Sequence, residues 1–199
     1  MSLIFNYSRI KDTVSRANLP GQKGKVAGNV DSITAFVTGS TGKYENGMAV
    51  KIVADSNGIR RATPIASGDT ADKVAGFIIQ DLRGETVISQ PFGAPRFIHE
   101  YANGVEVSVM SKGVIWVPVQ DSGEITAGSA VYIRNAADST NGKPIGGIES
   151  ATATGNVKLT GAYFTGRVGY PLANQNNGTT TAGLTGKTAE IAIELPFLA

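Results

Sequence analysis

The sequence predicts an all-β protein of short antiparallel strands, preceded by an extended N-terminal arm. Twenty-five glycines among 199 residues supply many tight turns. Val, Ile and Thr recur in short runs, which is typical of strands rather than long helices. Polar and apolar residues alternate in several of these runs, so each such strand has one face toward a core. A chain of this length can bury one substantial core.

The strands are predicted from ten short runs, each bounded by turn residues. These runs are 32–38, 48–53, 59–64, 74–79, 105–110, 114–119, 130–134, 157–159, 162–164 and 190–195. Asn57-Gly58 predicts a tight hairpin turn, because these residues adopt the positive φ angles that such turns require. Ser111-Lys112-Gly113 predicts the turn of a second hairpin. Pro118 cannot donate to a sheet, so it is expected at an edge or a strand end.

One segment of the chain is repeated. Residues 47–52 (Gly-Met-Ala-Val-Lys-Ile) recur as residues 128–133 (Gly-Ser-Ala-Val-Tyr-Ile). In each copy an Asn-Gly pair and then a Pro-Ile pair follow, and a glycine-containing strand comes after them. This order indicates a repeated unit in which a glycine turn leads into a strand, a hairpin and a returning strand.

The first 30 residues differ from the rest in charge. They carry five basic residues against Asp12, a net charge of +4, whereas the whole chain carries +2. The basic residues are Arg9, Lys11, Arg16, Lys23 and Lys25. The segment is interpreted either as an arm that docks on an acidic partner surface or as a solvated tail. We therefore expect a basic arm over 1–30 and a β-rich domain over 31–199, with about 136–189 as a candidate inserted or projecting lobe.

Several classes of protein are disfavoured by composition. The chain has no cysteine, so it has no disulfide framework and no thiolate metal site. No signal-peptide pattern and no run of eighteen apolar residues occurs, so neither secretion by a cleaved signal nor a membrane-spanning segment is expected. The basic residues of the arm lack interleaved aromatics, which disfavours direct nucleic-acid binding.

Candidate catalytic and ligand-binding residues are scarce. His99 is the single histidine, so a histidine metal cluster is excluded, and no Gly-x-Ser-x-Gly motif accompanies it. The sequence selects no pair of carboxylates for acid–base catalysis. Asp138-Ser139-Thr140-Asn141-Gly142 is a fragment of a calcium loop without its later glutamate. Trp116 is expected in the core rather than as a sugar-stacking platform. No catalytic residue, cofactor or metal site is predicted.

Aromatic residues gather in the stretch 92–101, where we interpret them as packing or interface contacts. Together with the basic arm, this stretch provides the candidate interface residues. They are Arg9, Lys11, Arg16, Lys23, Lys25, Phe92, Arg96, Phe97, His99 and Tyr101.

Four stretches resemble the structural cement (decoration) proteins of tailed-bacteriophage heads. They are Ala66-Ser67-Gly68-Asp69 with 74–78, Gly104–Val109, Lys112-Gly113-Val114, and Ala127–Tyr132. The resemblance covers about residues 45–135, and no resemblance is recognised over 136–189. It implies a compact β-barrel or β-sandwich, oligomeric contacts at capsid symmetry axes and no catalysis.

The function expected from this resemblance is that of a non-enzymatic virion protein on the outer capsid surface. It would bind the major capsid protein and cross-link its subunits, as a homo-oligomer (trimer or dimer) made in the host cytoplasm, without contacting nucleic acid or membrane. The alternative is a β-rich recognition module of a tail, baseplate or fibre that binds a host glycan or another virion protein. Residues 174–181, rich in Asn and Thr, are interpreted as a surface loop or a recognition tip.

Overall fold

The structure is a computed structural model. It describes residues 21, 23–24, 31–42, 44–79, 85–87, 99–120, 123–169 and 187–196, with the backbone alone at 85–87 and 99–100. Within these residues the chain forms twelve strands and one 3-10 turn, η1 (Ala71–Lys73), so the all-β prediction is confirmed. The candidate interface residues Arg9, Lys11, Arg16, Lys25, Phe92, Arg96 and Phe97 lie outside the described residues.

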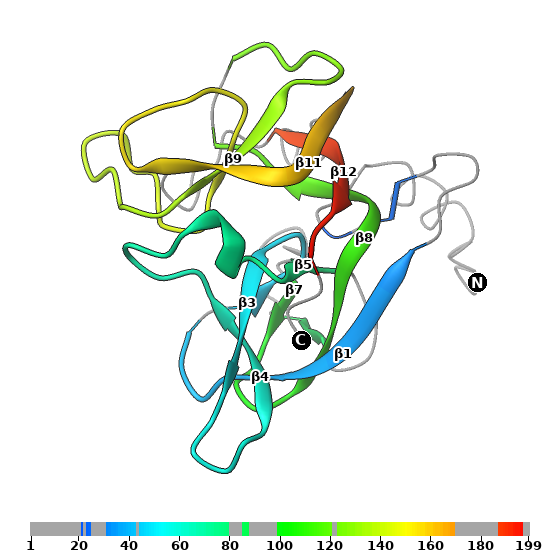
Figure 1. Ribbon diagram of the computed structural model, residues 1–199, viewed down its shortest axis with the longest axis vertical. Coiled ribbons are helices and arrows are strands. Elements are labelled where there is room, and N and C mark those ends of the chain that lie inside the picture. The colour runs from blue at the N-terminus through cyan, green and yellow to red at the C-terminus, as the bar shows by residue number, and fades with distance from the viewer. Residues whose placement is uncertain are drawn as a thin grey trace, which may run out of the picture.

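The strands follow one another along the chain with short connections between most of them (Figure 1). They are β1 (Ser32–Thr38), β2 (Tyr44–Glu45), β3 (Ala49–Ala54), β4 (Arg60–Pro64), β5 (Gly76–Ile78), β6 (Glu85–Val87), β7 (His99–Tyr101), β8 (Glu106–Pro118), β9 (Ala130–Arg134), β10 (Ile148–Glu149), β11 (Asn156–Gly169) and β12 (Thr188–Glu194). Strands β2, β7 and β6 form a small sheet, and the other nine belong to one large sheet.

The first part of the large sheet closes into a five-stranded barrel, which we call the first ring. Its strands follow the order β1, β4, β3, β5 and the N-terminal half of β8, which pairs again with β1. The β1–β4 contact is parallel and the other four are antiparallel. The predicted hairpin at Asn57-Gly58 joins β3 to β4, with Gly58 at a φ of 76°. The predicted barrel is thus confirmed.

The second part forms an equivalent ring, which we call the second ring. It consists of the C-terminal half of β8 followed by β12, β11, β9 and β10. A parallel bridge between Val119 and Ile148 closes it, supported by the hydrogen bond from Gln120 N to Ile148 O at 2.8 Å. Of the stretch 136–189, for which no family match was expected, residues 156–169 form β11 of this ring.

The two rings repeat the same hydrogen bonds. Thr38 N donates to Val105 O in the first ring, as Val119 N donates to Lys187 O in the second, and Gly39 N to Ala62 O corresponds in the same way to Gln120 N to Ile148 O. Gly47 N to Ile78 O corresponds to Gly128 N to Phe164 O, and Ile78 N to Met48 O corresponds to Phe164 N to Ser129 O. All eight bonds are between 2.8 and 2.9 Å long. The repeat detected at residues 47–52 and 128–133 is therefore a structural repeat, and β1 corresponds to the C-terminal half of β8.

Strand β8 differs from the sequence prediction. Residues 105–110 and 114–119 were expected to form a hairpin around Ser111-Lys112-Gly113, but they form one continuous strand of 13 residues. The N-terminal half pairs with β1 and β5, and the C-terminal half pairs with β12. Gly113, at a φ of 138°, lies between the halves. The hairpin prediction was wrong because each half finds its partners elsewhere in the chain. Pro118 ends the strand, as predicted.

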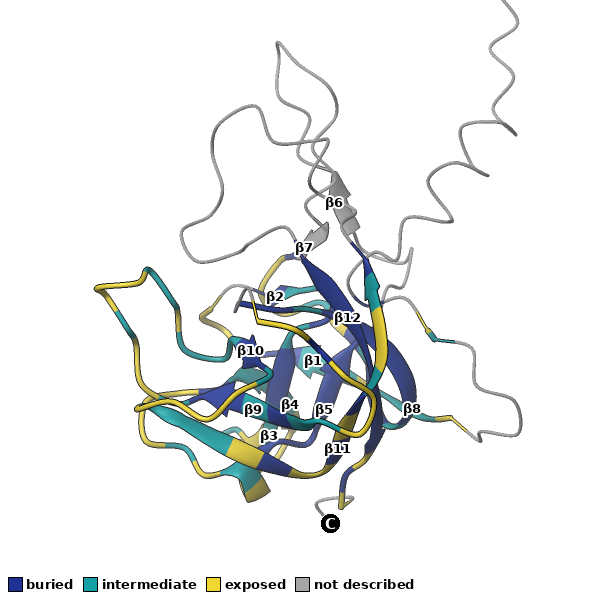
Figure 2. Cartoon of the chain, turned by 90° about the horizontal axis from the view of Figure 1, so that it is seen from above, coloured by how far each residue is buried: buried dark blue, intermediate teal, exposed yellow. Residues whose placement is uncertain are grey.

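Apolar side chains fill both rings and the space between them. One cluster lies in the first ring and includes Val50, Ala62, Ile78, Val107 and Val109. A larger cluster contains the buried side chains of the second ring. It also contains first-ring residues, among them Phe77 and Met110, whose side chains lie on the other face of their strands from those of the first cluster. Strands β8 and β12 are buried along most of their length (Figure 2). The larger cluster therefore joins the two rings into one core.

Candidate functional site

The end of the basic arm is attached to β8. Gly21 N donates to Trp116 O and Gly24 N donates to Val114 O, both at 2.7 Å. Lys23 forms an antiparallel bridge with Ile115. We call Gly21, Lys23 and Gly24 the arm anchor. It adds to the edge of β8 opposite β12, on the C-terminal half of the strand.

The two glycines of the arm anchor are required for different reasons, lack of space at Gly24 and backbone conformation at Gly21. A Cβ on Gly24 would lie 2.5 Å from Glu190 Oε1 and would also collide with Val114. Gly21 has a φ of 78°, a conformation that other residues adopt only at a cost. The close approach of the backbone to β8 and Glu190 thus explains Gly24, and the positive φ explains Gly21.

Lys23 is the one basic candidate of the arm that lies among the described residues. Its Nζ lies 3.3 Å from Asp31 Oδ2, and half of its side chain is exposed to solvent. An exposed ion pair of this kind contributes little to stability. Lys23 is therefore accessible to a partner, as expected for an interface residue, and its role there stays a prediction.

A buried carboxylate lies beneath the arm anchor. Glu190 of β12 is opposite Trp116 of β8 and is fully buried. Its Oε2 accepts a hydrogen bond from Thr165 Oγ1 at 2.8 Å, and its Oε1 lies 3.1 Å from Arg167 Nη1. The Trp116 side chain is only 6% exposed, which confirms its predicted place in the core. These contacts fix the surface on which the arm anchor lies.

The aromatic stretch 92–101 reaches the described residues at its end. His99 and Tyr101 belong to β7, where the backbone of His99 is paired with that of Val87. The Tyr101 side chain is only 2% exposed, and its hydroxyl donates to Asn46 Oδ1 at 2.8 Å. Of the two roles that the sequence left open for Tyr101, the structure places it in packing. It fills one end of the first ring beside Tyr44.

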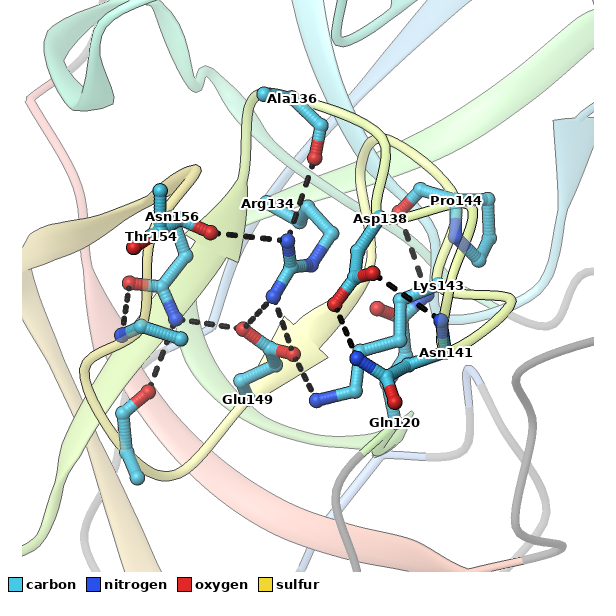
Figure 3. Close-up of polar contacts among 12 residues, drawn as sticks. Gln120, Arg134, Ala136, Asp138, Asn141, Lys143, Pro144, Glu149, Thr154 and Asn156 are labelled. Atoms are coloured by element: carbon cyan, nitrogen blue, oxygen red, sulfur yellow. Dashed lines mark hydrogen bonds and ion pairs between the residues drawn. The ribbon is translucent and has the colours of Figure 1, made fainter.

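A second buried polar cluster was not anticipated from the sequence (Figure 3). Arg134 and Glu149 are 2% and 1% exposed, and Arg134 Nη2 donates to Glu149 Oε1 at 2.9 Å and to Oε2 at 3.0 Å. Lys143 Nζ donates to Oε1 at 2.7 Å, and Asn156 Nδ2 donates to Oε2 at 2.5 Å. Arg134 Nη1 also donates to Thr154 O at 3.2 Å. The cluster ties the connections on either side of β10 to β9 and β11.

The chemistry of this cluster is that of a structural ion pair. Burial disfavours the charged form of Glu149, but hydrogen bonds from Lys143, Asn156 and Arg134 outweigh it and hold the pKa of the carboxyl below its usual 4.5. Both carboxylate oxygens already accept two hydrogen bonds each. A carboxylate saturated in this way is poorly suited to exchange protons with a substrate.

The predicted calcium-loop fragment forms a local turn. Asp138 Oδ1 accepts from Asn141 N at 3.1 Å, and Oδ2 accepts from the Asn141 side chain at 2.8 Å. In the part of the chain that the structure describes, no three His, Cys, Asp or Glu side chains gather into a metal site. Nor does any helix of the described residues have the length and apolar character needed to cross a bilayer.

Known proteins share both the sequence pattern and the fold of this chain. Residues 10–194 match the family described as "Structural cement protein (E217 gp24/Pam3 gp6)". The fold is similar to that of a chain from the structure "The capsid of Myoviridae Phage XM1", with a TM-score of 0.57 and 17% identity over 92% of this chain and 93% of the other. No curated protein matches the sequence. Because the family match spans most of the chain, the protein belongs to the structural cement proteins of bacteriophages, and its role is structural and associated with the capsid.

Proposed function

We propose that the protein binds the outer surface of a phage capsid and stabilises the shell by linking neighbouring major capsid subunits. Membership of the structural cement family supports this role. The observation that carries the linking mechanism is the arm anchor: a basic segment is fixed to the barrels at its C-terminal end, so the chain offers two contact regions joined covalently. One molecule that contacts two subunits gains affinity, because the second contact forms at high effective concentration.

Electrostatics favours the arm as one of the two contact regions. Residues 1–20 carry Arg9, Lys11 and Arg16 against Asp12, and Lys23 presents a half-exposed ammonium at the anchor. An acidic surface on a capsid subunit would attract this segment, and the attraction would weaken with salt. The contact needs no turnover, so we propose a non-enzymatic protein of the virion, made in the host cytoplasm, that touches neither nucleic acid nor membrane.

The packing of the rings agrees with a structural role. Apolar side chains fill the first ring and the space between the rings, and the buried carboxylates of Glu149 and Glu190 are held by hydrogen bonds and ion pairs. Such a body is rigid and offers its outer surface for contact. Rigidity lowers the entropy lost on binding, which strengthens a contact of given area.

The test is co-sedimentation with phage capsids that lack the protein. We expect saturable binding of the wild-type chain and a rise in the temperature at which the capsids release DNA. The double variant Arg9→Gln and Lys11→Gln should bind more weakly at low salt. The matched control, Lys73→Gln with Lys158→Gln, removes the same charge from exposed positions on the barrels. It should bind as the wild type does.

Three results would contradict parts of the proposal. Absence of saturable binding by the wild-type chain, or binding to host cells or glycans in its place, would reject the capsid role. Equal binding by the arm variant and the matched control would reject the arm as a contact region. Binding without any rise in the DNA-release temperature would reject the linking of subunits.

A further inference from the structure

The Asn-Gly pairs of this chain are held differently by the fold. The sequence has five of them, and four lie among the described residues, at 46–47, 57–58, 103–104 and 141–142. Asparagine is chemically labile, and in such a pair the backbone nitrogen of the glycine can attack the side-chain amide carbon. Glycine favours this attack because it has no side chain to restrict its backbone. The reaction requires that the two groups are free to approach each other.

In three of the four pairs a hydrogen bond holds one of the reacting groups. Gly47 N and Gly58 N each donate to a backbone carbonyl, at 2.8 and 2.9 Å. The Asn141 side chain donates to Asp138 Oδ2 at 2.8 Å. In each of these pairs a hydrogen bond must therefore break before the glycine nitrogen can reach the amide carbon.

The fourth pair, Asn103-Gly104, lies in the connection between β7 and β8, and neither of its reacting groups is held. The Asn103 side chain is exposed, and a Cβ on Gly104 would have no atom within 4 Å. Across the described ranges of the chain, neither the Asn103 side chain nor Gly104 N has a hydrogen-bond partner. The two groups can therefore meet without the loss of a hydrogen bond.

The ends of the same connection are fixed by Thr38 of β1. Thr38 Oγ1 donates to Ala102 O at 3.0 Å and accepts from Val105 N at 3.1 Å. Thr38 N donates to Val105 O at 2.8 Å. Thr38 is fully buried. The length of main chain between Ala102 and Val105 is therefore matched to these contacts with β1.

We propose that Asn103 is a site of spontaneous deamidation, which converts it into aspartate and isoaspartate as the protein ages. Gly104 N loses its proton to hydroxide and attacks Asn103 Cγ, the Cγ–Nδ2 bond breaks, and the amide nitrogen takes a proton from water and leaves as ammonia. Water then opens the cyclic imide at one of its two carbonyl groups. Opening at the original backbone carbonyl gives isoaspartate, whose main chain is longer by one carbon atom. That extra atom strains the contacts with Thr38.

The first test is peptide mapping of the full chain after prolonged incubation in buffer, so its result does not depend on the proposed capsid role. Mass spectrometry detects the replacement of the amino group by a hydroxyl, and chromatography separates aspartate from isoaspartate. Asn103 should lose its amide about five times faster than Asn57, where a hydrogen bond must open first. In guanidinium chloride the two rates should become equal, since the unfolded chain holds neither pair.

Two variants change which groups are held. Asp138→Ala releases the Asn141 side chain, so it should speed the loss of the amide at Asn141 and leave the rate at Asn103 unchanged. Asn103→Gln is the matched control, because its longer side chain must close a larger ring and reacts far more slowly. It should abolish the modification at this position.

The strain on the Thr38 contacts is tested by thermal unfolding. Aged wild-type protein that contains isoaspartate at position 103 should unfold at a lower temperature than fresh protein, whereas aged Asn103→Gln should unfold as it did when fresh. Fresh Asn103→Asp carries the added charge on a main chain of normal length. It should unfold as the fresh wild type does, which separates the effect of charge from that of main-chain length.

The proposal is overturned if Asn103 keeps its amide in the folded chain but loses it in guanidinium chloride. Reaction of Asn57 as fast as Asn103 in the folded chain would also overturn it, because the hydrogen bond of Gly58 would then give no protection. Unfolding of isoaspartate-containing protein at the temperature of fresh protein would reject the strain on the contacts with Thr38.

Discussion

At Glu149 the chain buries a carboxylate almost completely, and three donors keep it ionised. Arg134 binds both carboxylate oxygens, and Lys143 and Asn156 each bind one. Removing one partner of a buried ion pair leaves the other charge without compensation, which costs far more than the loss of an exposed pair. The cluster is therefore a sensitive point for the stability of the second ring.

We expect Arg134→Ala to lower the free energy of unfolding by about 3 kcal/mol, the lower end for a broken buried pair, because Glu149 loses its bidentate partner but keeps Lys143 and Asn156. The control is Lys112→Ala, which breaks an ion pair with Glu194 whose side chains are 43% and 73% exposed. That change should cost less than about 1 kcal/mol. Urea unfolding measures both. Similar losses in the two variants would contradict the structural role of the buried cluster.

The same carboxylate predicts a dependence on pH. The folded-state pKa of Glu149 lies below its usual 4.5, so the ionised form stabilises the fold above that pH. This contribution is lost as the pH falls through the folded-state pKa. The free energy of unfolding should therefore differ most between wild type and Glu149→Gln near neutral pH, and the difference should shrink in acid. Urea unfolding at several pH values measures it, with the exposed Glu194→Gln as a control. A constant difference would argue against the shift.

Among the elements, β8 has the widest set of contacts because it belongs to both rings. Its alternating sequence and central glycine fit a hairpin as well as a long bent strand, since both place alternate side chains on opposite faces. The structure selects the long strand because β1, β5 and β12 each offer edges to different parts of it. The alternation of side chains therefore predicted correctly which residues form strand, but not that they form one continuous strand.

The arm anchor can be tested with two equivalent glycines. Gly47 and Gly128 have φ angles of 77° and 82°, so alanine strains both positions by about 1–2 kcal/mol. A Cβ on Gly47 would also lie 3.0 Å from Gly21 N, 3.0 Å from Pro118 Cδ and 3.1 Å from Trp116 O, whereas no atom lies within 4 Å at Gly128. Gly47→Ala should therefore destabilise more and should speed amide exchange at Gly24. Thermal unfolding and hydrogen exchange measure these effects. Equal behaviour of the two variants would show that the anchor does not depend on this contact.

For the whole molecule, the cluster that joins the rings predicts a single cooperative unit. Ile78 and Phe164 are equivalent residues of the two rings, and both are fully buried. Ile78→Ala and Phe164→Ala should each cost about 2–5 kcal/mol and shift one shared transition. Calorimetry should give equal calorimetric and van't Hoff enthalpies for the wild type and both variants. Two separate transitions would show that the rings unfold independently.

The sequence by itself determined the all-β class, most strand positions, the Asn57-Gly58 hairpin, the repeat and the resemblance to cement proteins. Each of these depends on the alternation of apolar and polar residues or on turn residues within a short stretch, and such patterns need no contact with distant parts of the chain. Trp116 was placed in the core for the same reason, because it lies in an apolar alternating run.

Only the tertiary structure decided how these stretches meet. The closure of two rings around β8, the burial of Tyr101, the pairing of Arg134 with Glu149 and the attachment of Gly21 and Gly24 to β8 all join residues that are separated along the chain. Such contacts form when strands from distant parts of the sequence become neighbours. Their partners are therefore set by the packing of the whole chain, which no single stretch of sequence specifies.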